Sequence, residues 1–416
     1  MSDNRGHGSG VRTALVIGGG VAGPVTALAL RKAGIAATVH EAYPSAADGV
    51  GAWLGLAPNG QAALATVGAD AAVRALGQPV PGMVMADGAG RQLAGFGGFP
   101  ELPATLTLPR ERLFRALTDH AVTAGVRFAY GKRLVAAEET PEGVTAHFAD
   151  GTSATADILI GADGIRSTVR TVIDPQAPGP EYGGVLSFGG YATVGGAAGA
   201  EPGTMYFAFG RAFMGYWQGP DGRMIWFAGL PTDTPPSPAD LARVSHAEWL
   251  SRLRDLYTGH VPGERLLRHT GPDDLMVVGR MERMPSVPHW YRGRMVLVGD
   301  SAHAPSSSSG QGASLAIESA VELARCLRDL PSPAEAFAAY ESLRRPRVEA
   351  IGRNAAAVNK VKSGKSDAPA PAFPSPEEFL RPLHFHRIAW EAKVTAVSSS
   401  PSSRPSDASS ATTSCH

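Results

Sequence analysis

The chain has 416 residues, 38 basic and 38 acidic side chains and only 18% charged residues, which excludes the one-signed surface that nucleic acid or an anionic membrane requires. No apolar run approaches the roughly 20 residues that span a bilayer and no signal peptide opens the sequence, so we expect a cytoplasmic protein. Two cysteines, Cys326 and Cys415, make neither a disulfide framework nor a zinc site, and the length predicts two lobes plus tails.

The first predicted elements form a βαβ unit. After a polar, glycine-rich lead at residues 1–10, which we expect to be disordered, an apolar run at 12–17 predicts a strand. A helix follows at 21–33, and a second strand at 36–40 ends at Glu41. This unit of about thirty residues is the context that a dinucleotide-binding fingerprint needs.

The turn between the first strand and the helix carries the spacing G-x-G-x-x-G in Gly18, Gly20 and Gly23. The first glycine allows a tight turn, the second lets the backbone approach a pyrophosphate, and the third lets the helix pack on the strand. Glu41 is placed to accept hydrogen bonds from ribose hydroxyls and would repel a 2′-phosphate, so the site fits FAD or NAD rather than NADP. The alternative is an ordinary glycine-rich turn with Glu41 exposed.

The middle of the chain returns to a second strand end. Spacing of apolar residues predicts a helix at 110–124, and alternating runs at 134–139 and 144–148 predict a hairpin. The hairpin leads to an apolar strand at 157–161 that ends in Ala-Asp-Gly, with Asp163 and Gly164. Taken alone, this acidic strand end is better explained as a bare turn.

An aromatic stretch follows and differs from the rest of the chain. Alternating aromatic residues interrupted by Gly, Pro and Asp at 182–230 predict an antiparallel sheet, and a helix is expected at 239–258. The sheet forms either the floor of a substrate pocket or a packed layer without that role. Phe209, Tyr216 and Trp226 are the weak candidates for pocket-facing positions.

A third strand end lies near the end of the folded chain. Val-Leu-Val-Gly-Asp-Ser-Ala-His places Asp300 after an apolar strand, and Gly310-Gln311-Gly312 opens a helix. Another helix is expected at 333–358. Beyond residue 362 the composition shifts to Pro, Ser and Ala, with one amphipathic stretch at 377–394, and residues 398–414 cannot bury a core.

The three motifs in this order favour a bound dinucleotide, and FAD in particular. Together with the segments AWLGLAPNGQAAL and PRERLFRAL, they resemble the motifs of class A flavoprotein monooxygenases, the p-hydroxybenzoate hydroxylase-like family, over residues 12–350. The resemblance implies an α/β fold, with a Rossmann-like FAD-binding domain around a parallel sheet and a second domain whose antiparallel sheet covers the flavin.

The resemblance also implies positions for the cofactor. The first motif and Glu41 would hold the AMP half of FAD, Asp163 and Gly164 would lie near the pyrophosphate, Asp300 would bind the ribityl chain, and Gly312 the pyrimidine edge of the flavin. Arg110 matches an arginine on the flavin side, although it is also explained as a solvated charge at a helix start. The expected cofactor-binding residues are Gly18, Gly20, Val21, Ala22, Gly23, Glu41, Arg110, Asp163, Gly164, Asp300, Gly310, Gly312 and Ala313.

The same reasoning predicts how the chain divides. The expected FAD-binding domain is discontinuous, and the expected segments are 1–10 as a lead, 11–85, 105–175 and 275–360 as the FAD-binding domain, 86–104 and 176–274 as the substrate-binding sheet domain, 361–397 as a C-terminal extension and 398–416 as a disordered tail.

Two departures from the family pattern stand out. Ser307 occupies the position of a usual proline beside the flavin, and Ala42 replaces an Arg or Lys near the adenine. His303 is either an acid or base near the cofactor or a residue that satisfies local backbone, and we favour the second reading. His384 and His386 supply too few ligands for a metal site.

The expected activity is that of an NAD(P)H-dependent FAD monooxygenase. The hypothesis is that NADH or NADPH binds transiently and reduces FAD, and that a C4a-hydroperoxide then transfers one oxygen atom from O2 to an aromatic or electron-rich alkene substrate. No residue is a compelling catalytic base. The alternatives are a flavin-dependent reductase or dehydrogenase on the same fold, and a non-redox FAD-binding protein. No nucleic acid or membrane partner is expected.

Overall fold

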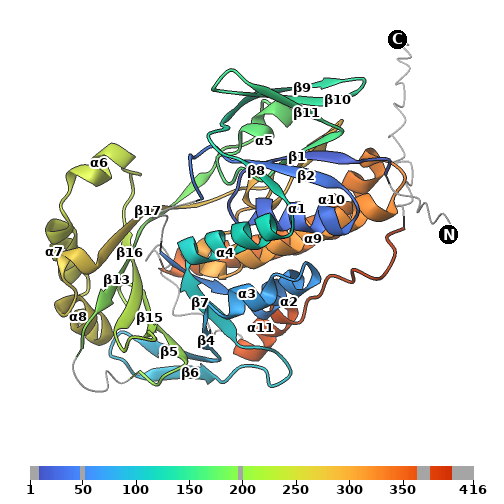
Figure 1. Ribbon diagram of the computed structural model, residues 1–416. Coiled ribbons are helices and arrows are strands. Elements are labelled where there is room, and N and C mark those ends of the chain that lie inside the picture. The colour runs from blue at the N-terminus through green and yellow to red at the C-terminus, as the bar shows by residue number, and fades with distance from the viewer. Residues whose placement is uncertain (1–8, 47–51, 195–199, 363–374, 396–416) are drawn as a thin grey trace, which may run out of the picture.

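The computed structural model describes residues 9–46, 52–194, 200–362 and 375–395 (Figure 1). The disordered lead expected at 1–10 falls outside this part except for Ser9 and Gly10, and the tail expected at 398–416 falls wholly outside it. Among the described residues, no helix combines the length and apolarity that a membrane span requires.

A largely parallel sheet forms the centre of the larger lobe. Its strands, in spatial order, are β18 (Tyr291–Arg292), β19 (Met295–Leu297), β12 (Ile158–Gly161), β1 (Thr13–Ile17), β2 (Ala36–His40) and β8 (Arg127–Ala129). All neighbours are parallel except β18 and β19. The strands predicted at 12–17, 36–40 and 157–161 are thus confirmed, and their apolar residues are buried because helices or a second sheet cover both faces.

Helices cover one face of this sheet (Figure 1). They are α1 (Ala22–Lys32), α4 (Arg110–Thr123), the long buried helix α9 (Gly312–Asp329) and α10 (Pro333–Lys362), with α2 (Pro58–Thr66) and α3 (Asp70–Arg74) beyond them. Gly34 follows α1 in the left-handed conformation, with φ of 84°, as a helix C-terminus favours. The predicted helices at 21–33, 110–124 and 333–358 are confirmed within a few residues at each end, and Cys326 is buried in α9.

The other face of the parallel sheet packs against a small antiparallel sheet. This layer contains β9 (Leu134–Thr140), β10 (Gly143–Phe148) and β11 (Ser153–Ala156), followed along the chain by α5 (Thr168–Ile173). The hairpin predicted at 134–139 and 144–148 is confirmed as β9 and β10. Buried Val144, Ala146 and Phe148 join the core of the larger lobe.

A seven-stranded sheet forms the second lobe. Its strands, in spatial order, are β17 (Leu275–Arg283), β13 (Glu181–Ala192), β16 (Met224–Pro231), β15 (Met214–Gln218), β14 (Thr204–Phe209), β5 (Gly82–Asp87) and β6 (Gln92–Phe96). The antiparallel sheet predicted over 182–230 is confirmed, and only β14 and β5 pair in parallel.

Two of the predicted domain boundaries differ from this sheet. The boundary between 85 and 86 falls inside β5, and β17, assigned to the FAD-binding segments from residue 275, pairs with β13 in the seven-stranded sheet. Both strands join the sheet by long-range pairing along its edges, which no local sequence pattern reports. The division into two domains stays a prediction, with these two boundaries moved to about 81 and 283.

The seven-stranded sheet has two different faces. Its rear face is covered by α7 (His246–Leu256) and α8 (Val261–Arg268), which lie on the outer side of the molecule in Figure 1. Its front face turns toward a three-stranded sheet of β3 (Trp53–Leu56), β7 (Thr105–Pro109) and β4 (Gln78–Val80). Because successive side chains of a strand point to opposite faces, one set packs against α7 and α8 and the other set points toward the larger lobe.

The single helix predicted at 239–258 is wrong, because two helices occupy this stretch. Helix α6 (Pro238–Arg243) ends before Val244, which is extended, and Ser245 begins α7. The Ser245 hydroxyl accepts a hydrogen bond from the backbone N–H of Glu248, and Ser237 caps α6 in the same way. Two serine caps eight residues apart therefore split one apolar pattern into two helices.

The C-terminal segment, defined here as residues 375–395, packs back onto the larger lobe. It contains α11 (Pro376–His384), which lies below α2 in Figure 1. Arg347 donates to the carbonyls of Pro382 and Leu383 at 3.0 and 3.1 Å, and Arg325 and Arg328 donate to carbonyls between 389 and 392. Arginines of α9 and α10 thus attach this segment to the lobe.

A buried ion cluster holds one of these arginines, Arg347, in place. Glu318 on α9 lies 2.7 Å from Arg344 and 3.0 Å from Arg347, and both it and Arg344 are almost fully buried. Burial raises the pKa of Glu318, but the two guanidinium groups more than offset it and hold the pKa at about 2. The pair is therefore ionised at all ordinary pH values, and removing one partner would leave a buried charge.

Candidate flavin site

The carboxyl ends of the parallel strands bring the three sequence motifs together. Ile17 pairs with Gly161 on one side and with His40 on the other, and Gly161 pairs with Leu297. The turns that follow these strands therefore lie next to one another at one edge of the sheet. In open α/β sheets this edge is where ligands bind.

Two glycines of the first motif are required by the chain itself. Gly18 has φ of 103°, and a Cβ there would lie 2.4 Å from the carbonyl oxygen of Ala162, which belongs to the second motif. A Cβ on Gly23 would lie 1.9 Å from the carbonyl oxygen of Gly18. These positions fix the tight turn and the close approach of α1 to β1, as the spacing predicts.

The second glycine of the motif, Gly20, is not explained by packing within the chain. A Cβ on Gly20 would meet nothing nearer than the Phe114 ring, at 3.9 Å. The helix that follows begins after Val21 with no side-chain cap and no acidic residue in its first turn. The free backbone N–H groups of this first turn, together with the open space at Gly20, fit the pyrophosphate of a dinucleotide.

Glu41 closes this turn from the neighbouring strand. Its carboxylate accepts hydrogen bonds from the backbone N–H of Gly19 at 2.6 Å and from that of Tyr43 at 2.9 Å. The side chain is half-buried, so it is held beside the glycine turn rather than solvated. A carboxylate oxygen can accept more than one bond, so the role toward ribose hydroxyls stays open to it and stays a prediction.

Asp163 of the second motif forms hydrogen bonds within the protein itself. Its carboxylate accepts hydrogen bonds from the backbone N–H groups of Thr168 and Val169 at 2.8 and 3.1 Å, and from the Ser167 hydroxyl at 2.5 Å. Burial raises its pKa above the ordinary value, and these bonds oppose the rise. Asp163 thus caps the start of α5 and fixes the loop, and Gly164 turns there with φ of 77°.

Arg170 connects the second motif to the third. This buried guanidinium donates to the carbonyl of Ile165 at 2.8 Å and to the carbonyl of Ser301 at 3.1 Å. Gly299, with φ of 66°, also packs closely, because a Cβ there would lie 3.0 Å from the Cβ of Ala22. All three motifs therefore form one contiguous surface, and Arg170 was not identified from the sequence.

Asp300 and Arg110 lie close together on this surface. The protein around Asp300 raises the pKa of its carboxyl to about 6 by desolvation, while the positive charge of Arg110 lowers it in part. Solvent nevertheless reaches the Asp300 side chain. The exposed carboxyl of Asp300 is therefore accessible to the polar groups of a ligand.

The start of α9 is also open. Gly310 has φ of 61°, and a Cβ on Gly310 or Gly312 would meet nothing within 4 Å. The helix has no side-chain cap and no acidic residue in its first turn, where Ala313 is half-buried. The geometry fits the electron-rich edge of a flavin ring, as it fits an anion.

The serine-rich loop at 306–309, where the family pattern has a proline, is stabilised by its own hydroxyl groups. Ser307 is exposed at the start of a short 3₁₀ turn, Ser307–Ser309. The hydroxyl of Ser306 accepts from the N–H of Ser308, and the hydroxyl of Ser309 accepts from the N–H of Gln311 at 3.0 Å. Side-chain hydroxyls thus stabilise a turn that proline would restrict.

A polar contact behind the α9 start was missed by sequence reasoning. The side-chain amide of Asn59, on α2, donates to Gln311 at 3.0 Å and to Glu318 at 2.7 Å. Gly60 packs so closely that a Cβ would lie 2.6 Å from the Ser314 hydroxyl. The segment APNGQAAL therefore positions the helix start, and its Asn-Gly pair was the available signal.

His303 is a packing residue rather than an acid or base at the surface of the site. It is buried, and its Nε2 lies 2.8 Å from the Ser319 hydroxyl. Burial, with a smaller effect of Arg344, lowers its pKa to about 3, so it stays neutral. The structural reading was favoured from the sequence, although the side chain bonds to a hydroxyl and not to backbone. Among the described residues, no cluster of His, Cys, Asp or Glu could hold a metal ion.

The front face of the seven-stranded sheet presents aromatic side chains toward the three-stranded sheet. The indole N–H of Trp53, on β3, donates to the Tyr191 hydroxyl at 2.8 Å, and its ring meets Trp217 edge-on. Phe227 packs against Trp217 and Phe207. Trp53 and Tyr191 thus join the two sheets across this wall.

Two of the three weak pocket candidates lie on the other face. Trp226 is 1% exposed, and its indole N–H donates to the Thr270 hydroxyl behind the sheet. Tyr216 pairs with Trp226 and joins the same rear core, so neither residue lines the front wall. Phe209 alternates with Ala208 of that core and lies on the front side. Successive residues of the aromatic strands point to opposite faces of the sheet. The sequence alone does not tell which set points to the front, because that depends on which face the helices cover.

Comparison with known sequences agrees with this geometry. The family described as FAD binding domain matches residues 12–355. The aurachin C monooxygenase/isomerase of Stigmatella aurantiaca is 32% identical over 343 residues, covering 80% of this chain and 85% of that protein. The FAD-dependent urate hydroxylase of Klebsiella pneumoniae is 30% identical over 347 residues, covering 80% and 86%.

Solved structures give the same result. The crystal structure of Klebsiella pneumoniae HpxO complexed with FAD and uric acid superimposes with a TM-score of 0.76 at 26% identity, covering 88% of this chain and 92% of that one. The similarity therefore extends over both lobes.

Proposed function

The chain belongs to the FAD binding domain family as a class A flavoprotein monooxygenase, and from this premise we propose that it hydroxylates an uncharged aromatic ring held against the front face of the seven-stranded sheet. It is an FAD-dependent oxidoreductase that inserts one atom of O2 and takes its electrons from a nicotinamide cofactor.

The assignment of residues to the cofactor is part of the proposal. The open first turn of α1 with Gly20 would hold the pyrophosphate, Glu41 the adenosine ribose, Asp300 the ribityl hydroxyls, and the start of α9 the pyrimidine edge. FAD, when bound, supplies the electron transfer and the activation of O2. The support is that α1 and α9 begin without a side-chain cap, that Gly20 and Gly312 adjoin open space, and that Glu41 is held beside the first glycine turn.

The chain's own contribution to the reaction is orientation and the exclusion of water. The half-buried rings of Trp53, Tyr191 and Phe227, with buried Trp217 behind them, would contact an aromatic substrate and keep the reacting atoms dry. Arg223 stacks on Tyr191 at 4.4 Å but pairs with Asp221 at 2.7 Å, so its charge is compensated. Asn59 and Gln311 would fix the helix start that faces the ring.

The relatives' names support the substrate class. They include a urate hydroxylase and a 3-amino-4-hydroxybenzoate 2-monooxygenase, and both act on planar rings, as their names state. The uncharged aromatic wall of this chain favours rings with few charges, such as phenols, indoles and larger fused aromatics. A reductase or a non-redox flavin protein is not favoured, because the relatives reported above are a monooxygenase and hydroxylases.

The experiment that tests the proposal is turnover with labelled oxygen. Purified protein loaded with FAD is given NADH or NADPH and a panel of phenols, indoles and fused aromatic compounds under ¹⁸O₂. We expect some members of the panel to accelerate NAD(P)H oxidation, with one labelled oxygen atom in the product. Accelerated oxidation that yields only unlabelled products with every compound contradicts the proposal.

A further inference from the structure

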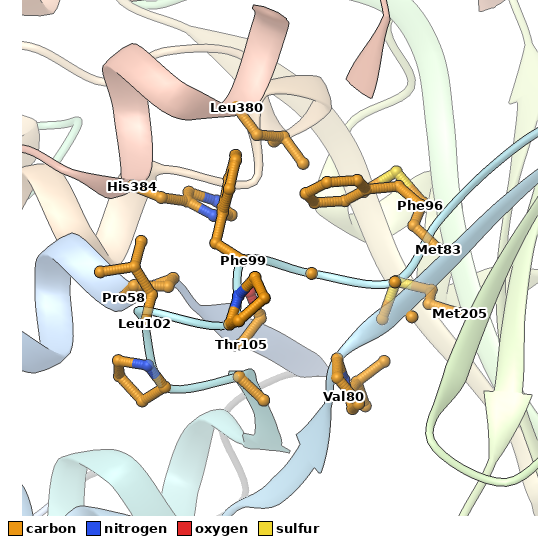
Figure 2. A pocket seen from close by; sticks show the side chains of 17 residues that line it. Pro58, Val80, Met83, Phe96, Phe99, Leu102, Thr105, Met205, Leu380 and His384 are labelled. Carbon is orange, nitrogen blue, oxygen red and sulfur yellow. The ribbon is translucent and has the colours of Figure 1, made fainter. Parts of the chain in front are cut away.

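A cavity of about 290 Å³ lies beside the front wall and is separate from the three motifs. Figure 2 shows side chains that line it from three parts of the fold: Met83 and Phe96 from the seven-stranded sheet, Phe99 from the loop after β6, and Leu380 from α11. Its size is at the lower end of the range of about 300–1,000 Å³ that is usual for small-molecule sites.

The lining of the cavity carries no permanent charge. Apart from His384 and Thr105, its side chains are apolar, and no Asp, Glu, Lys or Arg contributes to it. Burial, with a smaller effect of Arg387, lowers the pKa of His384 to about 4, so the imidazole is neutral at physiological pH. A hydrocarbon group would therefore leave water for this cavity favourably, and an ion would not.

The cavity adjoins both halves of the proposed active site. Pro58 lines it, and the next residue, Asn59, contacts Gln311 at the start of α9. Val80 and Met205 also line it and at the same time belong to the front-face cluster that contains Trp53 and Trp217. A ring stacked on the front wall could thus extend an attached group into the cavity without crossing a polar layer.

Two features of the lining suit a group of variable shape. Met83 and Met205 pair across β5 and β14, and their unbranched side chains adapt to different neighbours. The opposite wall is α11, where Leu380 points into the cavity in Figure 2. Arg381 stacks on Phe99 and Phe385, with the guanidinium 5.1 and 4.7 Å from the ring centres, and so braces this wall.

We propose that this cavity is a substrate subsite that binds an apolar substituent, an alkyl or alkenyl chain, carried by the aromatic ring that is hydroxylated. The proposal rests on the proposed function for the ring itself. It assigns α11 to substrate recognition: Leu380 and Phe99 limit the length of the chain that fits, and the C-terminal segment closes the subsite.

The test is a chain-length series measured by binding and by turnover separately. Phenol and 4-alkylphenols from 4-ethylphenol to 4-octylphenol are titrated into the FAD-loaded enzyme by calorimetry, and the same compounds are assayed under ¹⁸O₂. We expect affinity to rise about two- to fourfold for each added methylene until the cavity is full, because each methylene leaves water. Affinity that does not change with chain length overturns the proposal.

Leu380→Ala and Leu383→Ala provide a matched pair. Both leucines lie on α11 and are similarly buried, at 7% and 8% exposure, but only Leu380 lines the cavity. We expect Leu380→Ala to move the best-bound chain length upward by one to three carbons, and Leu383→Ala to leave it unchanged. The same shift in both variants, or in neither, contradicts the assignment of α11.

The two measurements separate the subsite from the reaction. Affinity that increases with chain length but without labelled product in any compound supports the subsite and counts against hydroxylation. Labelled product from an enzyme whose affinity is flat across the series does the reverse. Because the wild-type series is informative by itself, the test does not depend on either variant folding.

Discussion

The carboxyl edge of the parallel sheet and the front face of the seven-stranded sheet form different sides of the proposed active site, and they build those sides from different atoms. On the parallel sheet the important groups are mainly backbone, in the glycine turns and helix starts, and the one side chain among them is the Glu41 carboxylate. On the seven-stranded sheet they are side chains, and the strand backbone serves only to alternate them. A site made of backbone depends on single positions, whereas a site made of side chains depends on which face each residue occupies.

The largest expected effect is on the rear of the seven-stranded sheet. Trp226→Ala removes a ring that is 1% exposed together with its hydrogen bond to the Thr270 hydroxyl, so we expect the free energy of unfolding to fall by about 3–5 kcal/mol. Phe227→Ala, one residue away on the front face, should cost far less stability but weaken binding of aromatic substrates. Thermal denaturation and substrate titration of both variants decide the matter; equal losses of stability would contradict the assignment of faces.

The next effect concerns the glycine that packing requires. Gly23→Ala places a Cβ 1.9 Å from the Gly18 carbonyl oxygen, and α1 must move away from β1 to relieve the overlap. We expect a loss of about 2–3 kcal/mol in apo-protein stability, measured by urea denaturation without added FAD. An apo-protein as stable as the wild type would show that the turn is looser than described.

The glycine that packing does not require should behave in the opposite way. Gly20→Val adds a side chain in open space, so the apo-protein should keep its stability. FAD affinity, followed by the recovery of flavin fluorescence on release, should fall at least tenfold because the added methyl groups occupy the proposed place of the pyrophosphate. A variant that binds FAD normally would remove the main support for this placement.

The smallest effect is a pH dependence at Asp300. Because the apo-protein raises the pKa of this carboxyl to about 6, ionising it as the pH rises from about 4 to 6 destabilises the apo-protein. Ribityl hydroxyls that donate to the carboxylate would offset this, so FAD affinity should increase about threefold between pH 5 and pH 7.5. Asp300→Asn should abolish the increase. A wild-type affinity that is constant over this range contradicts the role.

The same contrast explains what could be read from the sequence. The strand ends at Gly18, Asp163 and Asp300 were predictable from the sequence. Where any side chain would clash with the backbone of a turn, only glycine is tolerated, and the motif therefore has glycine at fixed spacings. The aromatic sheet was predictable as a sheet, but Tyr216 and Trp226 were assigned to the front because alternation has two phases and only the covering helices choose between them.

Long-range partners account for the rest. Neither the pairing of β17 with β13 nor the bond between Trp53 and Tyr191 has a local signature, since residues 138 apart in the chain meet only in the fold. Asn59 and Arg170 were missed for the same reason: each bonds to groups that belong to another motif. Asparagine and arginine occur at many positions without such a role, and the importance of these two residues follows from the partners that the fold gives them.

The attachment of the C-terminal segment has a consequence for biosynthesis. Every other wall of the cavity is made by residues up to 205, whereas Leu380 and His384 leave the ribosome more than 170 residues later. Until the arginines of α9 and α10 bind the C-terminal segment, the nascent enzyme exposes an apolar cavity that a chaperone could recognise. On the proposed assignment of the cavity, selectivity for the chain of the substrate would be complete only after α11 has been translated and has packed onto the lobe.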